Sequence, residues 1–117
     1  MNYDLRTSPE DASQRMLNAL LPGTQVAIHR HPMSTEVVML LCGRMDEVLY
    51  RPADGGGAEG PLVEYERIHL DPRAGHFGCV VPAGVWHTVE VFEPSVIYES
   101  KDGAYGKDGS ESKRVAQ

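Results

Sequence analysis

Apolar residues divide the chain into an N-terminal stretch with helical spacing and a longer stretch with alternating spacing. Four apolar residues of the first stretch are spaced as on one face of a helix: Ala12, Met16, Ala19 and Leu20. Ser8-Pro9-Glu10-Asp11 has the composition of a helix start, and Pro22-Gly23 would end the helix. The pattern therefore predicts a short helix within residues 1–22, lying against the outside of a sheet.

From Gly23 onward, apolar and polar residues follow each other in short segments typical of β-strands. The predicted strands are residues 24–31, 36–42, 45–51, 62–70, 77–81, 87–92 and 95–100. Glycine- and proline-containing turns separate these segments at short intervals. Many short strands joined in this way predict an all-β sandwich or barrel over residues 23–105. The mostly polar residues 106–117 are predicted to form a flexible C-terminal tail.

The composition limits the classes of protein to which the chain can belong. A length of 117 residues, of which 41% are hydrophobic, is sufficient for one domain with one core. The net charge of −6 disfavours a nucleic acid or an anionic membrane surface as a partner. The first twenty residues include several charged side chains, which is not the pattern of a signal peptide. Cys42 and Cys79 lie in apolar runs and are predicted to be buried free thiols of a cytoplasmic protein.

Three of the five histidines and one glutamate form the strongest candidate for a chemical site. His29 and His31 are two residues apart, so a strand presents both imidazoles on the same face. Glu36 on the next predicted strand and His87 on a later one add a carboxylate and a third imidazole. Imidazole and carboxylate groups are typical ligands of divalent transition metals. The four residues therefore predict a metal site inside the barrel.

Each of these residues also has an ordinary structural explanation. A His-x-His pair on a strand is a two-ligand fragment that arises by chance, and a lone histidine is more often a core or surface residue than a ligand. Burying Glu36 beside three histidines without an ion would be costly, because a charged carboxylate needs compensation. The complete set therefore favours a metal, and its open coordination positions suit Fe(II), Mn(II), Ni(II) or Zn(II) without choosing among them.

Counting in twos from the predicted ligands identifies the side chains that would line a cavity around the metal. The side chains predicted to point inward with the ligands are those of Gln25, Val38, Leu40 and Val89, provided that no β-bulge interrupts the alternation. The cavity would then be mainly apolar. Four further residues are candidates for the cavity rim, although the sequence leaves their phase open: Tyr50, Tyr98, Glu99 and Lys101.

The two other histidines and the tryptophan are expected to have simpler roles. His69 lies in an alternating stretch and is predicted to be a surface or edge residue. His76 lies in a glycine-flanked turn, where it is exposed or overhangs the barrel mouth. Trp86 precedes the third candidate ligand and is expected to pack against the core.

The spacing of the candidate ligands resembles the two sequence motifs of the cupin superfamily. The first motif is matched by Gly23, five residues, His29-x-His31, four residues, Glu36, six residues and Gly43. The second motif is matched by Pro82-Ala83-Gly84-Val85-Trp86-His87. Two positions depart from the family pattern, because His76 stands where a glycine is usual and Val91 stands where an asparagine is usual. Neither position is usually a ligand, so the departures affect the assignment to an enzyme subfamily rather than the site.

Within this superfamily the chain resembles the WbuC-type cupin-fold metalloproteins over most of residues 12–105. The passages that carry this resemblance are residues 14–17 and 21–24, His29-Arg30-His31-Pro32, residues 82–88 and Glu99-Ser100-Lys101-Asp102-Gly103-Ala104-Tyr105. The resemblance implies a double-stranded β-helix (a jelly-roll barrel) with a metal on the four predicted ligands. It also implies a context of bacterial surface-polysaccharide synthesis and, by analogy of fold, a homodimer.

Three classes of function are compatible with these features. The first is a metal-dependent enzyme, isomerase-like, epimerase-like or dioxygenase-like, that acts on a small polar molecule such as a sugar or sugar nucleotide. The second is a non-catalytic binding module in which the metal holds a ligand or stabilises the barrel. The third is a protein that works through its oligomeric surface.

Overall fold

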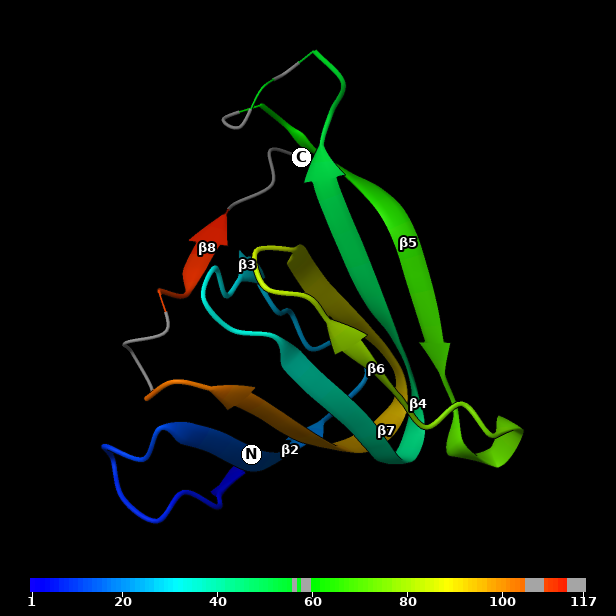
Figure 1. Ribbon diagram of the computed structural model, residues 1–117. Coiled ribbons are helices and arrows are strands. Elements are labelled where there is room, and N and C mark those ends of the chain that lie inside the picture. Colours follow the sequence, from blue (N-terminus) through cyan, green and yellow to red (C-terminus); the bar gives the residue numbers. More distant parts are fainter. Residues whose placement is uncertain (56, 58–59, 105–108, 114–117) are drawn as a thin grey trace.

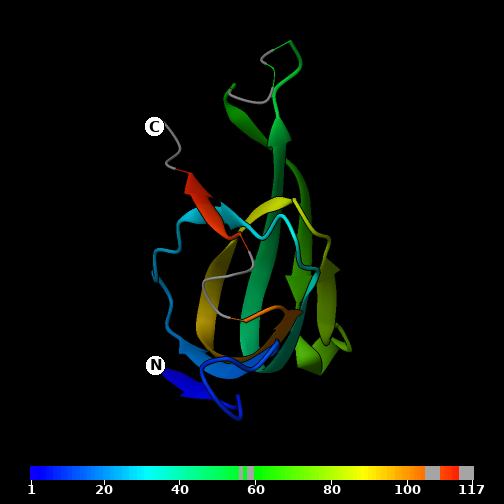
Figure 2. The ribbon, with the colours of Figure 1, turned by 60° about the vertical axis from the view of Figure 1, so that its left-hand side comes forward.

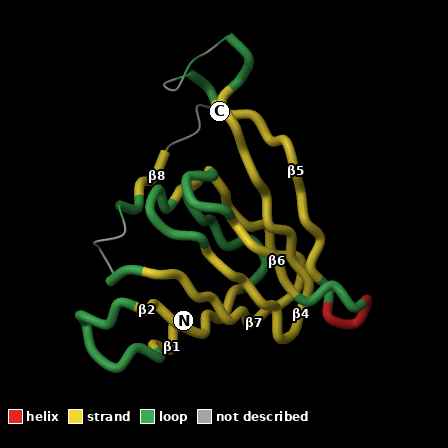
Figure 3. Tube along the Cα trace, viewed as in Figure 1, coloured by secondary structure: helices red, strands yellow, loops and turns green. Residues whose placement is uncertain are grey.

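The regular secondary structure of the described residues consists almost entirely of β-strands (Figures 1 and 3). The computed structural model describes residues 1–55, 57, 60–104 and 109–113. Its strands are β1 (Asn2–Asp4), β2 (Ser13–Leu20), β3 (Ile28–Arg30), β4 (Glu36–Pro52), β5 (Leu62–Leu70), β6 (Gly78–Val81), β7 (Trp86–Asp102) and β8 (Glu111–Lys113). A single 3₁₀ turn, η1 (Pro72–Ala74), is the only helical element in the described part of the chain. The predicted all-β class is therefore confirmed.

Two long antiparallel strands, β4 and β7, hold the two sides of the structure together (Figure 1). Their pairing runs from Glu36 opposite Lys101 to Tyr50 opposite Trp86. At one end the pair is flanked by β2 and β6, and at the other by β3 and β5. Each long strand therefore contributes one half to each side of the barrel, and Figure 2 shows the strands curving around its interior.

The predicted N-terminal helix is wrong, because the residues concerned form strand β2, paired with the second half of β7. Met16 and Leu20 are four residues apart, and this spacing fits one face of a strand as well as one face of a helix. Leu20 is buried, whereas Ala12 and Ala19 are exposed. The alternation of period two therefore accounts for the burial of this segment better than the helical period does.

The hydrophobic core lies between the two sides, beside the bend of the long strands. It consists of buried side chains from β2, β4, β5 and β7, namely Leu20, Val38, Leu40, Met45, Leu70, Val91 and Ile97. Because both sides contribute to this cluster, it fixes their separation and keeps the adjoining interior open for polar side chains.

Part of the predicted C-terminal tail pairs with the barrel. Strand β8 lies antiparallel to β3, and an ion pair of 2.9 Å joins Arg30 to Glu111. The predicted flexibility of residues 106–108 and 114–117 falls outside the described residues and stays a prediction.

Both cysteines are free thiols, as the sequence suggested, but their burial differs from the prediction. Cys42 is exposed because it lies where the register between β4 and β7 shifts, and Cys79 is half-buried. In the described part of the chain, no helix has the length and apolar character needed to cross a membrane.

At Gly43 the backbone of β4 approaches that of β7 closely. Gly43 has φ of 96°, and a Cβ atom there would overlap the carbonyl oxygen of Pro94 and the Cα of Ser95. This contact lies within the register shift that bends β4 from one side of the barrel to the other. The glycine of the first motif is therefore explained by the path of the strand.

Replacing Gly43 by alanine is expected to lower the free energy of unfolding by about 2–4 kcal/mol, since backbone strain and a steric overlap add. Gly23→Ala is the matched control, because Gly23 has φ of 83° and no atom within 4 Å of the added Cβ. The control should lose only about 1–2 kcal/mol, the cost of the left-handed conformation. Urea unfolding of both variants measures the difference. Equal losses would contradict the steric account of Gly43.

Candidate metal centre

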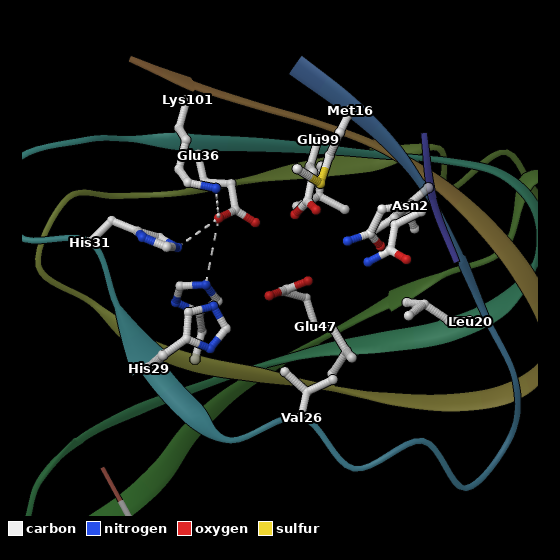
Figure 4. Close-up of a pocket in the computed structure, with 15 residues that line it drawn as sticks. Asn2, Met16, Leu20, Val26, His29, His31, Glu36, Glu47, Glu99 and Lys101 are labelled. Atoms are coloured by element: carbon white, nitrogen blue, oxygen red, sulfur yellow. Dashed lines mark ion pairs between the residues drawn. The ribbon is translucent and has the colours of Figure 1, made fainter. Parts of the chain in front are cut away.

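Three imidazoles and one carboxylate meet inside one end of the barrel (Figure 4). His29 lies on β3, His31 follows this strand, Glu36 begins β4, and His87 lies near the start of β7. One nitrogen of each histidine and one oxygen of the glutamate all lie within 4.8 Å of one another. These four residues can therefore hold a single metal ion.

The strand pairing explains why residues distant in sequence converge. His29 lies opposite His87 in the antiparallel ladder of β3 and β7, so their rings are neighbours, with centroids 4.2 Å apart. Two residues further along the chain, His31 has the same phase as His29, and the centroids of these two rings are 5.1 Å apart. Glu36 reaches the same space from β4.

Hydrogen bonds orient two of the imidazoles for metal binding. The Nδ1 of His29 lies 2.8 Å from the carbonyl oxygen of Ala27, and that of His87 lies 2.9 Å from the carbonyl oxygen of Val85. A carbonyl oxygen only accepts hydrogen bonds, so Nδ1 carries the proton and Nε2 has the free lone pair. Such an outer contact is typical of metal-binding histidines.

The third imidazole is held by two neighbours. The Nδ1 of His31 lies 2.6 Å from the hydroxyl oxygen of Ser110, which precedes β8. Its Nε2 lies 3.0 Å from Oε2 of Glu36. The pairing of β8 with β3 thus places the C-terminal segment beside the site.

The centre of the cluster is deeply buried. Glu36 and His87 are 4% and 2% exposed. The Nε2 of His87 lies 3.8 Å from Oε2 of Glu36 and, among the residues that the structure describes, has no hydrogen-bond partner. A buried nitrogen lone pair without a donor fits a metal ligand, because a bound ion would satisfy it.

The electrostatic environment keeps His29 and Glu36 in the protonation states that a metal requires. Burial lowers the pKa of His29 to about 4, and the nearby His87 contributes to the decrease. Burial alone would raise the pKa of Glu36, but the interactions with His31 and His87 outweigh it and hold the pKa well below its usual range. Neutral imidazoles and an ionised carboxylate are the metal-binding forms of these side chains.

A cavity of about 250 Å³ adjoins the four residues. It is lined by Asn2, Met16, Asn18, Leu20, Val26, Val38, Glu47, Val89, Ile97, Glu99 and Lys101, together with the four candidate ligands. Val38 and Val89 were predicted to lie here, and Glu99 and Lys101 were candidates for the rim. The ammonium of Lys101 lies 3.9 Å from Oε2 of Glu36.

The other predicted lining residues lie elsewhere. Gln25 is exposed, because β3 begins only at Ile28 and the alternation does not extend back to it. Leu40 has the inward phase but belongs to the hydrophobic core beyond the cavity. Tyr98 lies between the inward-facing Ile97 and Glu99, so its side chain has the opposite phase, and the cavity-lining residues do not include it.

Glu47 is the functional candidate that the sequence analysis missed. Counting every second residue along β4 from Glu36 places Glu47 on the outer face of the strand. It lies on the inner face instead, because the register shifts between Leu40 and Met45. After the shift the odd-numbered residues face inward, and Glu47 lies opposite Val89. Gly43 signals a break in the strand, but the number of residues in the irregularity cannot be read from the sequence.

Three further residues that the sequence singled out lie outside the cluster, as does the rim candidate Tyr50, which is not among the cavity-lining residues. His69 is exposed, and its Nδ1 lies 2.7 Å from the buried carboxylate of Asp46. His76 is exposed in the turn after η1. Trp86 is half-buried, and the guanidinium of Arg30 stacks 4.6 Å from its ring centre.

One family model is similar to part of the chain. A family model described as "Domain of unknown function (DUF6016)" matches residues 1–57, slightly less than half of the chain. This segment contains His29, His31 and Glu36 but not His87. No curated protein sequence matches the chain.

Several solved structures share the fold. A dTDP sugar isomerase from Desulfovibrio desulfuricans G20 is 20% identical with a TM-score of 0.69, over 96% of this chain and 73% of that one. A protein with a double-stranded β-helix domain from Klebsiella pneumoniae is 15% identical with a TM-score of 0.61, over 97% and 84%. The capsular polysaccharide assembling protein CapF from Staphylococcus aureus is 15% identical with a TM-score of 0.66, over 99% and 32%.

The chain spans only 27% to 58% of the length of several other structures that it matches. At these identities the likeness concerns the fold alone. The architecture is that of a double-stranded β-helix, or jelly-roll barrel, as the motif resemblance implied.

The lowered pKa of His29 predicts how the stability of the chelator-treated protein depends on pH. The unfolded state, with a histidine pKa near 6.5, binds a proton at a higher pH than the folded state, with a pKa of about 4. The free energy of unfolding should therefore decrease as the pH falls from about 6.5 to about 4. Urea unfolding across this range should show a smaller decrease for His29→Asn. The exposed control His76→Asn should keep the decrease of the parent protein, and an unchanged slope in His29→Asn would contradict the assignment.

Proposed function

We propose that the protein binds one divalent first-row transition metal through His29, His31, Glu36 and His87, and a small oxygen-bearing molecule beside it. The observation that carries this proposal is the convergence of three imidazoles and a buried carboxylate on one point. The hydrogen bonds from Nδ1 of His29 and His87 direct their Nε2 atoms as ligands.

The charge balance of the cavity supports a bound cation. Glu36, Glu47 and Glu99 bring three carboxyl groups into one enclosure, and Lys101 is the one lysine or arginine among the described residues that line it. Removing several carboxylates from water is costly without compensating positive charge. A divalent ion together with the ammonium of Lys101 would compensate the negative charge of those carboxyl groups that are ionised.

Four protein ligands leave room for another molecule at the metal. A six-coordinate ion would keep two open positions, and these would face the cavity lined by β1, β2, β4 and β7. When bound, the metal would act as a Lewis acid toward an oxygen atom of the ligand. Lys101, close to Glu36, would attract a ligand with negative or partly negative oxygen atoms.

A sugar or a sugar nucleotide is the ligand class that we infer. Two of the proteins with this fold are described as a sugar isomerase and a capsular polysaccharide assembling protein. The cavity combines amides, carboxyl groups and apolar side chains, which suits a molecule with both hydroxyl groups and C–H surfaces. The WbuC-type resemblance of residues 12–105 supports the same class.

Metal analysis of the purified variants tests the ligand set. His31→Ala should lose stoichiometric metal, since it removes a nitrogen ligand and the imidazole that lies 3.0 Å from Oε2 of Glu36. Glu36→Gln should weaken metal binding less, because an amide oxygen can still coordinate. His76→Ala, which removes an exposed imidazole outside the cluster, should keep one metal per chain.

Inductively coupled plasma mass spectrometry gives the metal content, and circular dichroism shows whether each variant keeps its strands. Full occupancy in a folded His31→Ala variant would refute the proposed ligands. Equal losses in the His31 and Glu36 variants would show that the negative charge dominates the affinity.

A further inference from the structure

Glu47 is a buried carboxyl group on the wall of the cavity, outside the four candidate ligands. It is 1% exposed and lies on β4, with Ile68 of β5 and Val89 of β7 opposite it in the two ladders. Figure 4 shows its carboxyl group directed into the cavity, toward the histidines. The side chain thus has apolar neighbours across the sheet and a polar end that faces the space beside the metal site.

The polar end of Glu47 has an unsatisfied atom. In the described part of the chain, its Oε2 has no hydrogen-bond partner. The adjacent Asp46 shows the contrast, because this buried carboxylate is bound by Arg67 at 3.0 Å and by His69 at 2.7 Å on the outer face. A buried polar atom without a partner is costly, so a residue that serves only the fold would be expected to have one.

The surroundings of Glu47 favour its protonated form. Burial raises its pKa well above the usual range, and the carboxyl groups of Glu36 on β4 and Glu99 on β7 raise it further. The other titratable groups around it are the thiol of Cys79 on β6, the imidazoles of the cluster and the ammonium of Lys101. A neutral carboxylic acid can donate a hydrogen bond as well as accept one.

We propose that Glu47 contacts the molecule held at the open position of the metal site, hydrogen-bonding to one of its oxygen atoms and exchanging a proton with it. This inference rests on the proposed function. It defines the ligand as a molecule with two oxygen atoms in reach of each other, one for the metal and one for Glu47. Carboxylates, hydroxy acids and vicinal diols have this arrangement.

The exchange is a simple proton transfer. The O–H bond of the Glu47 carboxyl group breaks, and its electron pair stays on the carboxylate oxygen. A lone pair of the ligand oxygen forms the new O–H bond, and the reverse transfer restores the starting state. The buried position places the donor where bulk water is excluded, which strengthens such a contact.

The experiment uses the full chain loaded with one equivalent of Co(II), whose visible absorption reports its ligands, and acetate as the probe. One acetate oxygen would bind the metal, and the other would accept the hydrogen bond from Glu47. The variants are Glu47→Leu, which removes the donor, and Glu47→Gln, whose amide can donate but cannot ionise. Glu66→Gln is the control, because Glu66 is an exposed carboxylate on β5 that does not line the cavity.

Acetate should bind Glu47→Leu about tenfold more weakly than the parent protein, the loss expected for one hydrogen bond to a charged acceptor. In the parent protein, acetate affinity should fall as the pH rises and Glu47 ionises, because a carboxylate repels acetate and donates no hydrogen bond. Glu47→Gln should lack this part of the pH dependence, and Glu66→Gln should keep it. The Glu47→Gln titration tests the proposal even where Glu47→Leu fails to fold.

Equal acetate affinity and equal pH dependence in the parent protein and both Glu47 variants would overturn the proposal and leave the metal site intact. Loss of cobalt from Glu47→Gln would also overturn it, because Glu47 would then be a metal ligand. Failure of the parent protein to bind cobalt, or to bind acetate once loaded, would contradict the proposed function itself. The first two outcomes are read from the Glu47 variants and the last two from the parent protein alone. Failure of this proposal can therefore be distinguished from failure of the proposed function.

Discussion

The antiparallel pairing of β4 with β7 is the constraint on which the rest of the structure depends. Both strands pass from one side of the barrel to the other, so a single ladder joins the two sides. The ladder carries Glu36 and His87 at its opposite ends, and β3 adds His29 by pairing beside His87. The bend at Gly43 is what allows one strand to serve both sides, and it also sets which residues of the second half face inward.

This arrangement concentrates polar groups in an interior that is otherwise apolar. The core cluster occupies the region around the bend, and the carboxyl groups and imidazoles occupy the adjoining cavity. Folding must remove these groups from water, so their cost is offset only if they contact one another, an ion or a ligand. The contacts around Glu36 meet this requirement in part. Two atoms without a hydrogen-bond partner among the described residues, Nε2 of His87 and Oε2 of Glu47, mark where the remaining partners belong.

Much of the fold and of the candidate site could be predicted from the sequence. The spacing of His29 and His31 predicted that they share a face, because side chains two residues apart on a strand point to the same side. That Glu36 and His87 join them was predicted from the resemblance to the two cupin motifs. The N-terminal helix was predicted wrongly, since apolar residues four apart, such as Met16 and Leu20, satisfy both periods. Glu47 was missed because a register shift changes the phase of β4, and such a shift depends on contacts with β7 that no local pattern reports.

X-ray absorption spectroscopy of the protein loaded with one equivalent of metal tests the central claim most directly. The account predicts a first shell of nitrogen and oxygen atoms only, with the outer-shell scattering of three imidazole rings and one or two exchangeable oxygen ligands. Imidazole distances should be about 2.0–2.1 Å if the metal is zinc. A first shell containing sulfur, or one with fewer than two imidazoles, would contradict it.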